Sequence, residues 1–124
     1  MGERVVLVVE DNERSLKLAC DVLRLRGYAP LEARTGAEAV ALATEHRPAL
    51  VLMDIQLPDM DGVAALGELR ANPDTADIPV VAVTALAMKG DRERLLEQGF
   101  DGYLAKPISV RTFVDDLAPL MGPA

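Results

Sequence analysis

The sequence predicts an α/β fold in three layers, with a parallel five-stranded sheet covered by helices on both faces. Two observations lead to this prediction. Short, nearly uninterrupted apolar runs recur along the chain, and segments with helical periodicity separate them. Apolar runs of this kind are typical of parallel strands that are buried on both faces. With 124 residues and a hydrophobic content of 50%, the chain has the size of a single domain spanning residues 1–124.

Five segments are expected to be strands. Residues 5–9, 49–53 and 78–83 are the clearest, because they are almost entirely apolar and end next to acidic or hydroxyl side chains. Residues 29–33 have a weaker pattern, and we expect this strand at an edge of the sheet. Residues 103–105 form a short fifth strand.

Five segments between and after the strands are expected to be helices: 15–26, 36–46, 63–71, 90–98 and a last helix after Ser109. Thr35 and Ser109 have side chains suited to capping the helices that follow them. Apolar residues at helical spacing predict one core-facing stripe on each of four helices. The expected stripes are Leu16, Ala19, Cys20 and Leu23; Ala37, Val40, Ala41 and Thr44; Val63, Leu66 and Leu69; and Val110, Phe113, Val114, Leu117 and Met121.

Alternating strands and helices with right-handed crossovers favour a doubly wound (βα)5 sheet, and we predict the flavodoxin-like strand order 2-1-3-4-5. In this order the first, third, fourth and fifth strands are neighbours, and their carboxyl ends meet at one edge. Ligands of open α/β sheets bind at this edge. The polar residues that the order brings there are Glu10, Asp11, Asp54, Thr84 and Lys106.

These residue types match the chemistry of phosphoryl transfer. Carboxylates of Glu10, Asp11 and Asp54 would repel one another, and an all-oxygen acidic site suits a hard cation such as Mg²⁺. An aspartate can act as a nucleophile toward phosphorus, and we assign this role to Asp54. Lys106 and Thr84 would stabilise the charge on the phosphoryl oxygens.

Composition excludes several classes of partner. The net charge is −7 and the pI is about 4.6, so a nucleic acid or an anionic membrane surface would be repelled. Aromatic residues make up only 3% of the chain and there is no Trp, so base stacking is poorly supplied. The sequence has neither a signal-peptide pattern nor an apolar run that could span a bilayer, and its single Cys excludes an internal disulfide. We therefore expect a cytoplasmic protein whose output partner is another protein.

Four motifs resemble the receiver domains of two-component response regulators, the CheY-like family. They are VVEDN at 8–12, MDIQLPDMDG at 53–62, PVVAVTA at 79–85 and YLAKP at 103–107. The resemblance covers nearly the whole chain. The tracts IPVVAVTALAMKGDRER and KPISV look most like single-domain receivers of the DivK type.

The resemblance implies a phosphoryl-accepting switch. Asp54 would accept phosphate from a phosphohistidine on a sensor histidine kinase or a histidine phosphotransfer protein. Glu10 and Asp11 would hold Mg²⁺ together with Asp54 and the backbone carbonyl of Gln56. Lys106 would bind the phosphoryl group and be set by a cis peptide bond to Pro107.

The same resemblance assigns the signal output. Thr84 and Tyr103 would form the switch, and the face made by the fourth helix, fifth strand and fifth helix, roughly 88–121, would bind a downstream protein. Gln56 and Leu86 would flank the path of water to the acyl phosphate. Because Leu86 offers an attacking water no hydrogen bond, we expect a longer phosphoryl lifetime than in receivers with a polar residue there.

Other interpretations remain open at this point. Taken singly, each of these residues has an ordinary structural role: Glu10 and Asp11 as helix N-terminal acids, Asp54 and Thr84 as turn or cap residues, Lys106 as a surface charge. Tyr103 could be strand packing; likewise Cys20 is expected in the core and His46 on the surface.

Three alternative functions compete with the switch. A haloacid-dehalogenase-like phosphohydrolase would need a second acid where Gln56 stands, and a flavodoxin-like cofactor carrier would need a Gly-rich phosphate loop. A receiver fold used only for docking, without phosphorylation, leaves the acids unexplained. We favour a stand-alone receiver that is not a turnover enzyme.

Overall fold

The computed structural model describes residues 4–85, 90–106, 108–109 and 111–121. In this part of the chain five strands alternate with five helices. The elements are β1 (Val5–Val9), α1 (Glu13–Leu25), β2 (Ala29–Ala33), α2 (Gly36–His46), β3 (Leu50–Asp54), α3 (Gly62–Ala71), β4 (Val80–Thr84), α4 (Asp91–Glu97), β5 (Gly102–Ala105) and α5 (Phe113–Met121). The strands pair in parallel in the order β2-β1-β3-β4-β5. The predicted fold class and strand order are confirmed, and β2 lies at an edge as expected.

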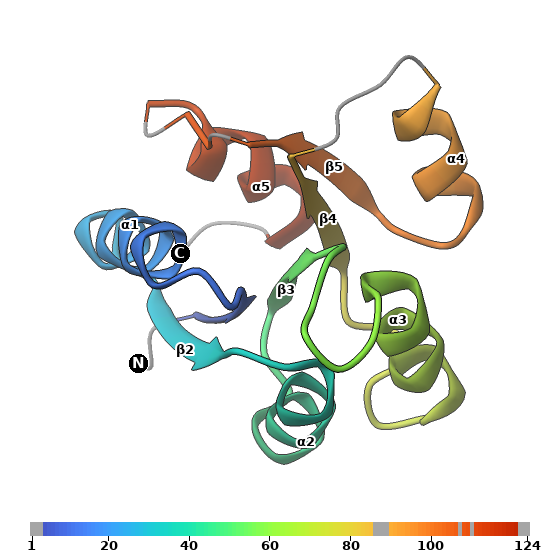
Figure 1. Cartoon of the computed structure of the whole chain (residues 1–124). Helices are drawn as coiled ribbons and strands as arrows, with labels where there is room; N and C mark the ends of the chain where they lie inside the picture. The colour runs from blue at the N-terminus through green and yellow to red at the C-terminus, as the bar shows by residue number, and fades with distance from the viewer. Residues whose placement is uncertain (1–3, 86–89, 107, 110, 122–124) are drawn as a thin grey trace.

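The sheet lies between two layers of helices (Figure 1), with α1 and α5 on one face and α2 and α3 on the other. Alternate residues of each central strand face opposite layers. In β1, Val6 and Val8 pack with α1 and α5, whereas Leu7 and Val9 pack with α2 and α3. Because both faces of the central strands are buried, their sequences are continuous apolar runs rather than alternating ones.

Helix α1 begins earlier than the predicted residue 15. The side chain of Asn12 accepts hydrogen bonds from the amides of Arg14 and Ser15, which makes Asn12 the N-cap. The predicted apolar stripe is confirmed, because its four residues, Leu16, Ala19, Cys20 and Leu23, are at most 2% exposed. Cys20 therefore belongs to the core, and burial raises the pKa of its thiol to about 11.

The predicted stripe of α2 is wrong at Ala37 and Ala41, although Val40 packs against the core. The buried residues of α2 are Gly36, Ala39 and Ala43, whereas Ala37 and Ala41 are exposed. Several alanines on different sides of a helix give little hydrophobic contrast, so the periodicity does not fix which side faces the sheet. His46 lies exposed in the last turn, as expected.

The later helices follow the predictions more closely. In α3 Leu66 and Leu69 are buried together with Ala65, while Val63 is only half-buried. In α5 the predicted core residues Phe113, Val114 and Leu117 are buried. The helix itself begins at Phe113, whose amide donates to the Ser109 carbonyl at 3.0 Å. Val110 and the side chain of Met121 lie outside the described residues.

The amino ends of β4 and β5 are tied to α3 through Arg70. Its guanidinium donates to the carbonyls of Ala76 at 2.9 Å and Ile78 at 2.7 Å, and to the Asp101 carboxylate at 2.8 Å. Asp101 also accepts the amide of Val80 at 2.8 Å. One side chain thus joins a helix, the loop before β4 and the turn before β5.

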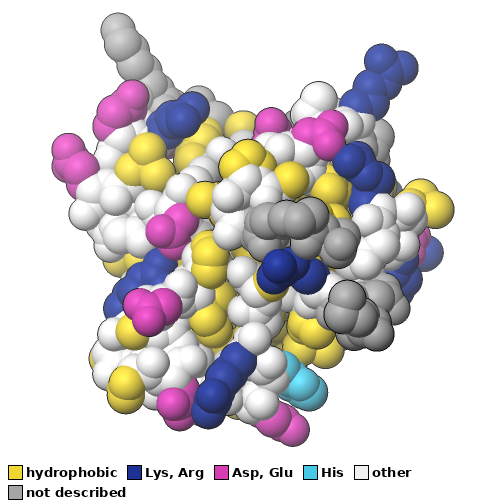
Figure 2. All heavy atoms as spheres, turned by 180° about the vertical axis from the view of Figure 1, so that it is seen from behind, with side chains coloured by type: hydrophobic (Ala, Val, Ile, Leu, Met, Phe, Trp, Pro, Cys, Tyr) yellow, Lys and Arg dark blue, Asp and Glu magenta, His cyan; other side chains and the backbone are white. Residues whose placement is uncertain are grey.

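The surface on the far side from the view of Figure 1 is mixed in charge. Figure 2 shows Lys and Arg side chains there among acidic and hydrophobic ones. On the described part of this face the Lys and Arg side chains form no continuous patch. No described helix combines the length and hydropathy required to cross a membrane.

Candidate functional site

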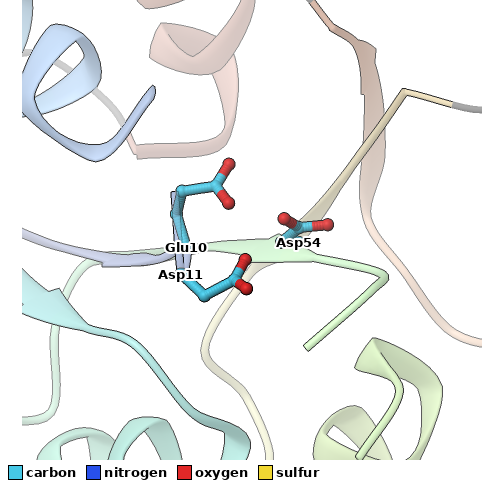
Figure 3. Close-up of side chains that lie close together, drawn as sticks. All are labelled: Glu10, Asp11 and Asp54. Carbon is cyan, nitrogen blue, oxygen red and sulfur yellow. The ribbon is translucent and has the colours of Figure 1, made fainter. Parts of the chain in front are cut away.

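Three carboxylates meet at the carboxyl ends of β1 and β3. Glu10 and Asp11 directly follow β1, and Asp54 is the last residue of β3. Glu10 and Asp54 are buried, 5% and 6% exposed, whereas Asp11 is open to solvent. One oxygen from each of the three lies within 4.8 Å of the others, and Figure 3 shows the three carboxyl groups gathered at this point. The convergence that the strand order predicts is confirmed.

A single lysine lies between the two buried acids. The Lys106 ammonium is 3.0 Å from Oδ2 of Asp54 and forms an ion pair with Oε1 of Glu10. Its backbone amide donates to the Thr84 carbonyl at 2.8 Å, which fixes the end of β5 against the end of β4. Thr84 is buried at the end of β4. All five residues that the sequence places at this edge are therefore found there.

The electrostatics of the cluster leave an excess of negative charge. Burial and the hydrogen bond with Asp54 raise the pKa of Glu10 to about 7. Burial lowers the pKa of Lys106, but its hydrogen bonds to Glu10 and Asp54 outweigh burial and raise it above the usual value. One ammonium shared by two buried carboxylates cannot neutralise both of them, and Asp11 adds a third negative group.

The loop between β3 and α3 is fixed at its base. The Gln56 amide donates to Oδ1 of Asp54 at 3.0 Å, and Gln56 pairs with Asp61 in an isolated antiparallel bridge. The Gly62 amide donates to the Ile55 carbonyl at 2.7 Å. A Cβ on Gly62 would lie 2.7 Å from the carbonyl oxygen of Asp54, so only glycine fits at this close approach. Gln56 is thereby held beside the acidic cluster.

The donor set fits a hard divalent cation. The cluster offers carboxylate oxygens from Glu10, Asp11 and Asp54, with no nitrogen or sulfur ligand among them. Mg²⁺ is held in proteins by one or two carboxylates and keeps several water ligands, so an open, three-carboxylate cluster with one exposed member suits it. The residues present therefore fit magnesium.

Tyr103 lies apart from the carboxylates. It is half-buried in β5, pairs with Ala82 of β4 and packs against the hydrophobic cluster under α3 and α4. Leu86 and Pro107, with the cis bond expected before Pro107, lie outside the described residues.

Two residues at the site were missed by the sequence reasoning. Asn12 caps α1, and its amide donates to Oε2 of Glu10 at 3.1 Å. An Asn just before a periodic helical segment was the available signal. Asp59 in the loop after β3 binds the start of α2, and nothing local in the sequence indicates that contact.

Comparisons with known proteins agree with this geometry. Residues 6–118 match the model of the response regulator receiver domain family. The polar-differentiation response regulator DivK of Brucella anthropi is 46% identical over 119 residues, which are 96% of this chain and 97% of that protein. DivK of Brucella ovis is 45% identical over the same shares of the two chains.

Solved structures give the same result. The receiver domain of the sensor histidine kinase PA1611 from Pseudomonas aeruginosa, solved with a magnesium ion in its active-site cleft, is 36% identical, with a TM-score of 0.89. That alignment covers 98% of this chain and 99% of the other. A response regulator from Chloroflexus aurantiacus is 27% identical and has a TM-score of 0.90. That alignment covers 97% of this chain and 98% of the other. The chemotaxis regulator CheY4 of Vibrio cholerae, 24% identical with a TM-score of 0.88 and coverage of 96% and 99%, shares the fold.

Proposed function

The chain belongs to the response regulator receiver domain family of two-component signalling, and from this premise we propose that it is a switch that is phosphorylated on Asp54. The observation that carries the proposal is the contact between Lys106 and Asp54, 3.0 Å long, beside two further carboxylates. A buried carboxylate at the end of a strand, with a fixed cation next to it, is placed to attack phosphorus. The proposal makes the protein a phosphoryl acceptor and not a turnover enzyme.

Each residue has one task in the transfer. A carboxylate oxygen of Asp54 forms the bond to phosphorus while the phosphorus–nitrogen bond of a phosphohistidine breaks, and the imidazole leaves with the electron pair. The Lys106 ammonium offsets the charge on the phosphoryl oxygens, and the Thr84 hydroxyl donates a hydrogen bond to one of them. Both groups come from neighbouring strand ends that are fixed to each other by a backbone hydrogen bond.

We propose that Glu10, Asp11, Asp54 and the Gln56 carbonyl hold Mg²⁺. When bound, the ion neutralises charge on the phosphoryl oxygens in the transition state. The magnesium ion in the cleft of the related PA1611 receiver domain supports this assignment. The excess of negative charge in the cluster supports it independently.

The phosphoryl donor would be a sensor histidine kinase or a histidine phosphotransfer protein. A phosphoryl group adds a charge of about −1.5 to −2 at the edge of the sheet. Thr84 would turn toward it, and Tyr103 would follow from its half-buried position on β5. The resulting change would be read by a downstream protein on the α4, β5 and α5 face.

A pocket supports this choice of output face. It has a volume of about 400 Å³ and lies beside Tyr103 and Leu104 of β5, with Arg92 of α4 and Asp116 of α5 on its walls. A residue that moves in the switch would therefore change the shape of a surface that a partner can enter.

The cytoplasmic location expected from the sequence stays a prediction.

The alternative of a haloacid-dehalogenase-like phosphohydrolase gains no support. Gln56 takes the position of its general acid, and the matching family is that of receiver domains. The docking-only alternative predicts that Asp54→Asn keeps all regulated binding, whereas the switch predicts its loss.

Intact mass spectrometry tests the proposal. The protein is incubated with acetyl phosphate or phosphoramidate and Mg²⁺, and we expect a single labile phosphoryl adduct. The adduct should be absent in Asp54→Asn and when EDTA replaces Mg²⁺. An adduct that persists in Asp54→Asn, or repeated turnover of a small phosphate ester, would contradict the proposal.

Gln56 and Leu86 are proposed to flank the path of water to the acyl phosphate, and the lifetime of the adduct tests the role of Leu86. We expect hydrolysis in Leu86→Glu to be faster than in the wild type, because a carboxylate can hydrogen-bond an attacking water. Equal or slower hydrolysis in the variant would show that the apolar residue does not protect the acyl phosphate.

A further inference from the structure

The loop after the proposed phosphorylation site is attached to a distant helix. The carboxylate of Asp59 accepts the Gly36 amide at 2.8 Å through Oδ1 and the Ala37 amide at 3.0 Å through Oδ2. Both oxygens are thus used on the first turn of α2, 22 and 23 residues away in the sequence. These two hydrogen bonds hold the pKa of Asp59 below its usual range, so the carboxylate is ionised at neutral pH.

An apolar contact lies next to this polar one. A Cβ on Gly36 would be 2.5 Å from Cγ and 2.6 Å from Sδ of Met60. The Met60 side chain therefore occupies the space that any other residue at position 36 would need. Two consecutive loop residues, Asp59 and Met60, rest on the same helical turn.

Helix α2 has a second, independent cap. The Thr35 hydroxyl accepts the Glu38 amide at 3.1 Å, and the Glu38 carboxylate accepts the Arg34 amide at 3.0 Å. This local arrangement satisfies the amides of Glu38 and Arg34, whereas those of Gly36 and Ala37 donate to Asp59. The contact made by Asp59 therefore has a feature that local capping lacks: it fixes the tip of the loop that contains Gln56.

The loop between β3 and α3 is therefore held both at its base and at its tip. Its base is fixed by the Gly62 and Gln56 amides, and its tip by Asp59. We propose that Asp59 is a positioning residue for the metal site, because it clamps the loop to α2 and so keeps the Gln56 backbone beside the acidic cluster. This inference rests on the proposed function, in which the Gln56 carbonyl is a ligand of Mg²⁺.

A magnesium titration followed by ¹H–¹⁵N NMR tests the inference on the full chain. We expect Asp59→Ala to weaken Mg²⁺ affinity by about tenfold, in the range found when a residue that orients a metal ligand is lost. Asp59→Asn, which keeps one acceptor oxygen, should lie between Asp59→Ala and the wild type. Hydrogen exchange of the Gly36 and Ala37 amides should become faster in Asp59→Ala.

Thr35→Ala is the matched control. It removes a cap from the same helix but leaves the loop contact intact, so it should destabilise the fold while keeping the wild-type Mg²⁺ affinity. With phosphoramidate and saturating Mg²⁺, phosphorylation of Asp59→Ala should return to near the wild-type rate, because only ligand placement has been weakened.

The outcomes separate the two proposals. A wild-type protein that does not bind Mg²⁺ would overturn the proposed function itself. Wild-type binding with unchanged affinity in Asp59→Ala would overturn the clamp alone, and so would an equal loss of affinity in Thr35→Ala. Should Asp59→Ala not fold, Asp59→Asn decides: affinity equal to that of the wild type would refute the clamp.

Discussion

The two ends of the sheet treat charge in opposite ways. At the carboxyl ends of the strands, Glu10, Asp11 and Asp54 crowd around one lysine, and two of the three acids are buried. Like charges in a partly dehydrated site repel one another, so this end costs stability in the absence of a bound cation. The three carboxylates would therefore be stabilised by a bound cation.

At the amino ends, both terminal nitrogens of the Arg70 guanidinium donate hydrogen bonds within the chain. The guanidinium donates to the carbonyls of Ala76, Ile78 and Gly99 and to Asp101, and Asp101 in turn accepts the Val80 amide. The charges compensate within the chain, so this end contributes stability. The comparison shows that charged side chains stabilise the fold where the chain supplies their partners. Where the chain supplies too few partners, the charged side chains can bind a cation or react.

The largest effect that we expect comes from supplying a cation to the acidic end. Mg²⁺ at about 100 times its dissociation constant should raise the free energy of unfolding by about 2.7 kcal/mol, because it binds only the folded protein. Urea denaturation with Mg²⁺ or with EDTA measures the shift. In Asp11→Asn the shift should largely disappear, and an equal shift in that variant would mean that the ion binds elsewhere.

The second effect tests the compensated end. Arg70→Met removes the side-chain donor to three carbonyls and to Asp101, and we expect a loss of about 2 kcal/mol in the free energy of unfolding. Circular dichroism during urea denaturation measures the loss, and the stabilisation by Mg²⁺ should remain. Arg24→Met is the control, since Arg24 lies exposed on α1 with only a 3.5 Å ion pair to Asp21. A similar loss in the free energy of unfolding in both variants would show that the hydrogen bonds of Arg70 do not stabilise the fold.

The third effect concerns pH. The pKa of Glu10 is raised to about 7 in the folded protein, above its ordinary value of 4.5. Between these two values the folded state binds more protons than the unfolded state, so stability present below pH 4.5 is lost as the pH rises to 7.

In EDTA, we expect Glu10 to contribute a decline of about 1 kcal/mol across this window, reduced from the full linkage value because Glu10 shares its site with other charged groups. Glu10→Gln should flatten the decline, as measured by urea denaturation at several pH values. A slope that is the same in both proteins would show that Glu10 is not the group responsible.

The smallest effect that we expect concerns an exposed ion pair away from both ends of the sheet. Lys17 and Asp21 on α1 form an exposed ion pair at 2.8 Å. Such pairs contribute little because solvent screens them and two flexible side chains must be ordered. Lys17→Ala should therefore leave the denaturation midpoint unchanged within error, and a clear shift would mean that pairing alone stabilises this protein, whatever the burial.

Most of the fold could be predicted because the pattern is strong and local. The central strands are apolar runs, and the order of neighbours then follows from alternating elements and crossover handedness. The strand order alone was enough to predict that Glu10, Asp54 and Lys106 converge at one edge of the sheet. No side-chain position had to be known.

What the sequence did not indicate depends on contacts between distant residues. The buried face of α2 includes Gly36, which packs against Met60, while the alanines at 37 and 41 look as apolar as those at 39 and 43. The contacts of Arg70 with Asp101 and of Asp59 with Gly36 join residues 31 and 23 positions apart. A surface charge and a charge with fixed partners are alike in one sequence, so only the assembled layers distinguish them.

The bare backbone at the start of α2 sets a limit on engineering. Exchanging a helical glycine for alanine ordinarily strengthens a helix by roughly 0.5–1 kcal/mol. At position 36, however, the added methyl would lie 2.5 Å from Cγ and 2.6 Å from Sδ of Met60, so the Met60 side chain, next to Asp59, would have to move. A routine thermostabilising exchange in this helix would thus disturb the loop that the proposed clamp holds beside the acidic cluster, so glycine should be kept at this position.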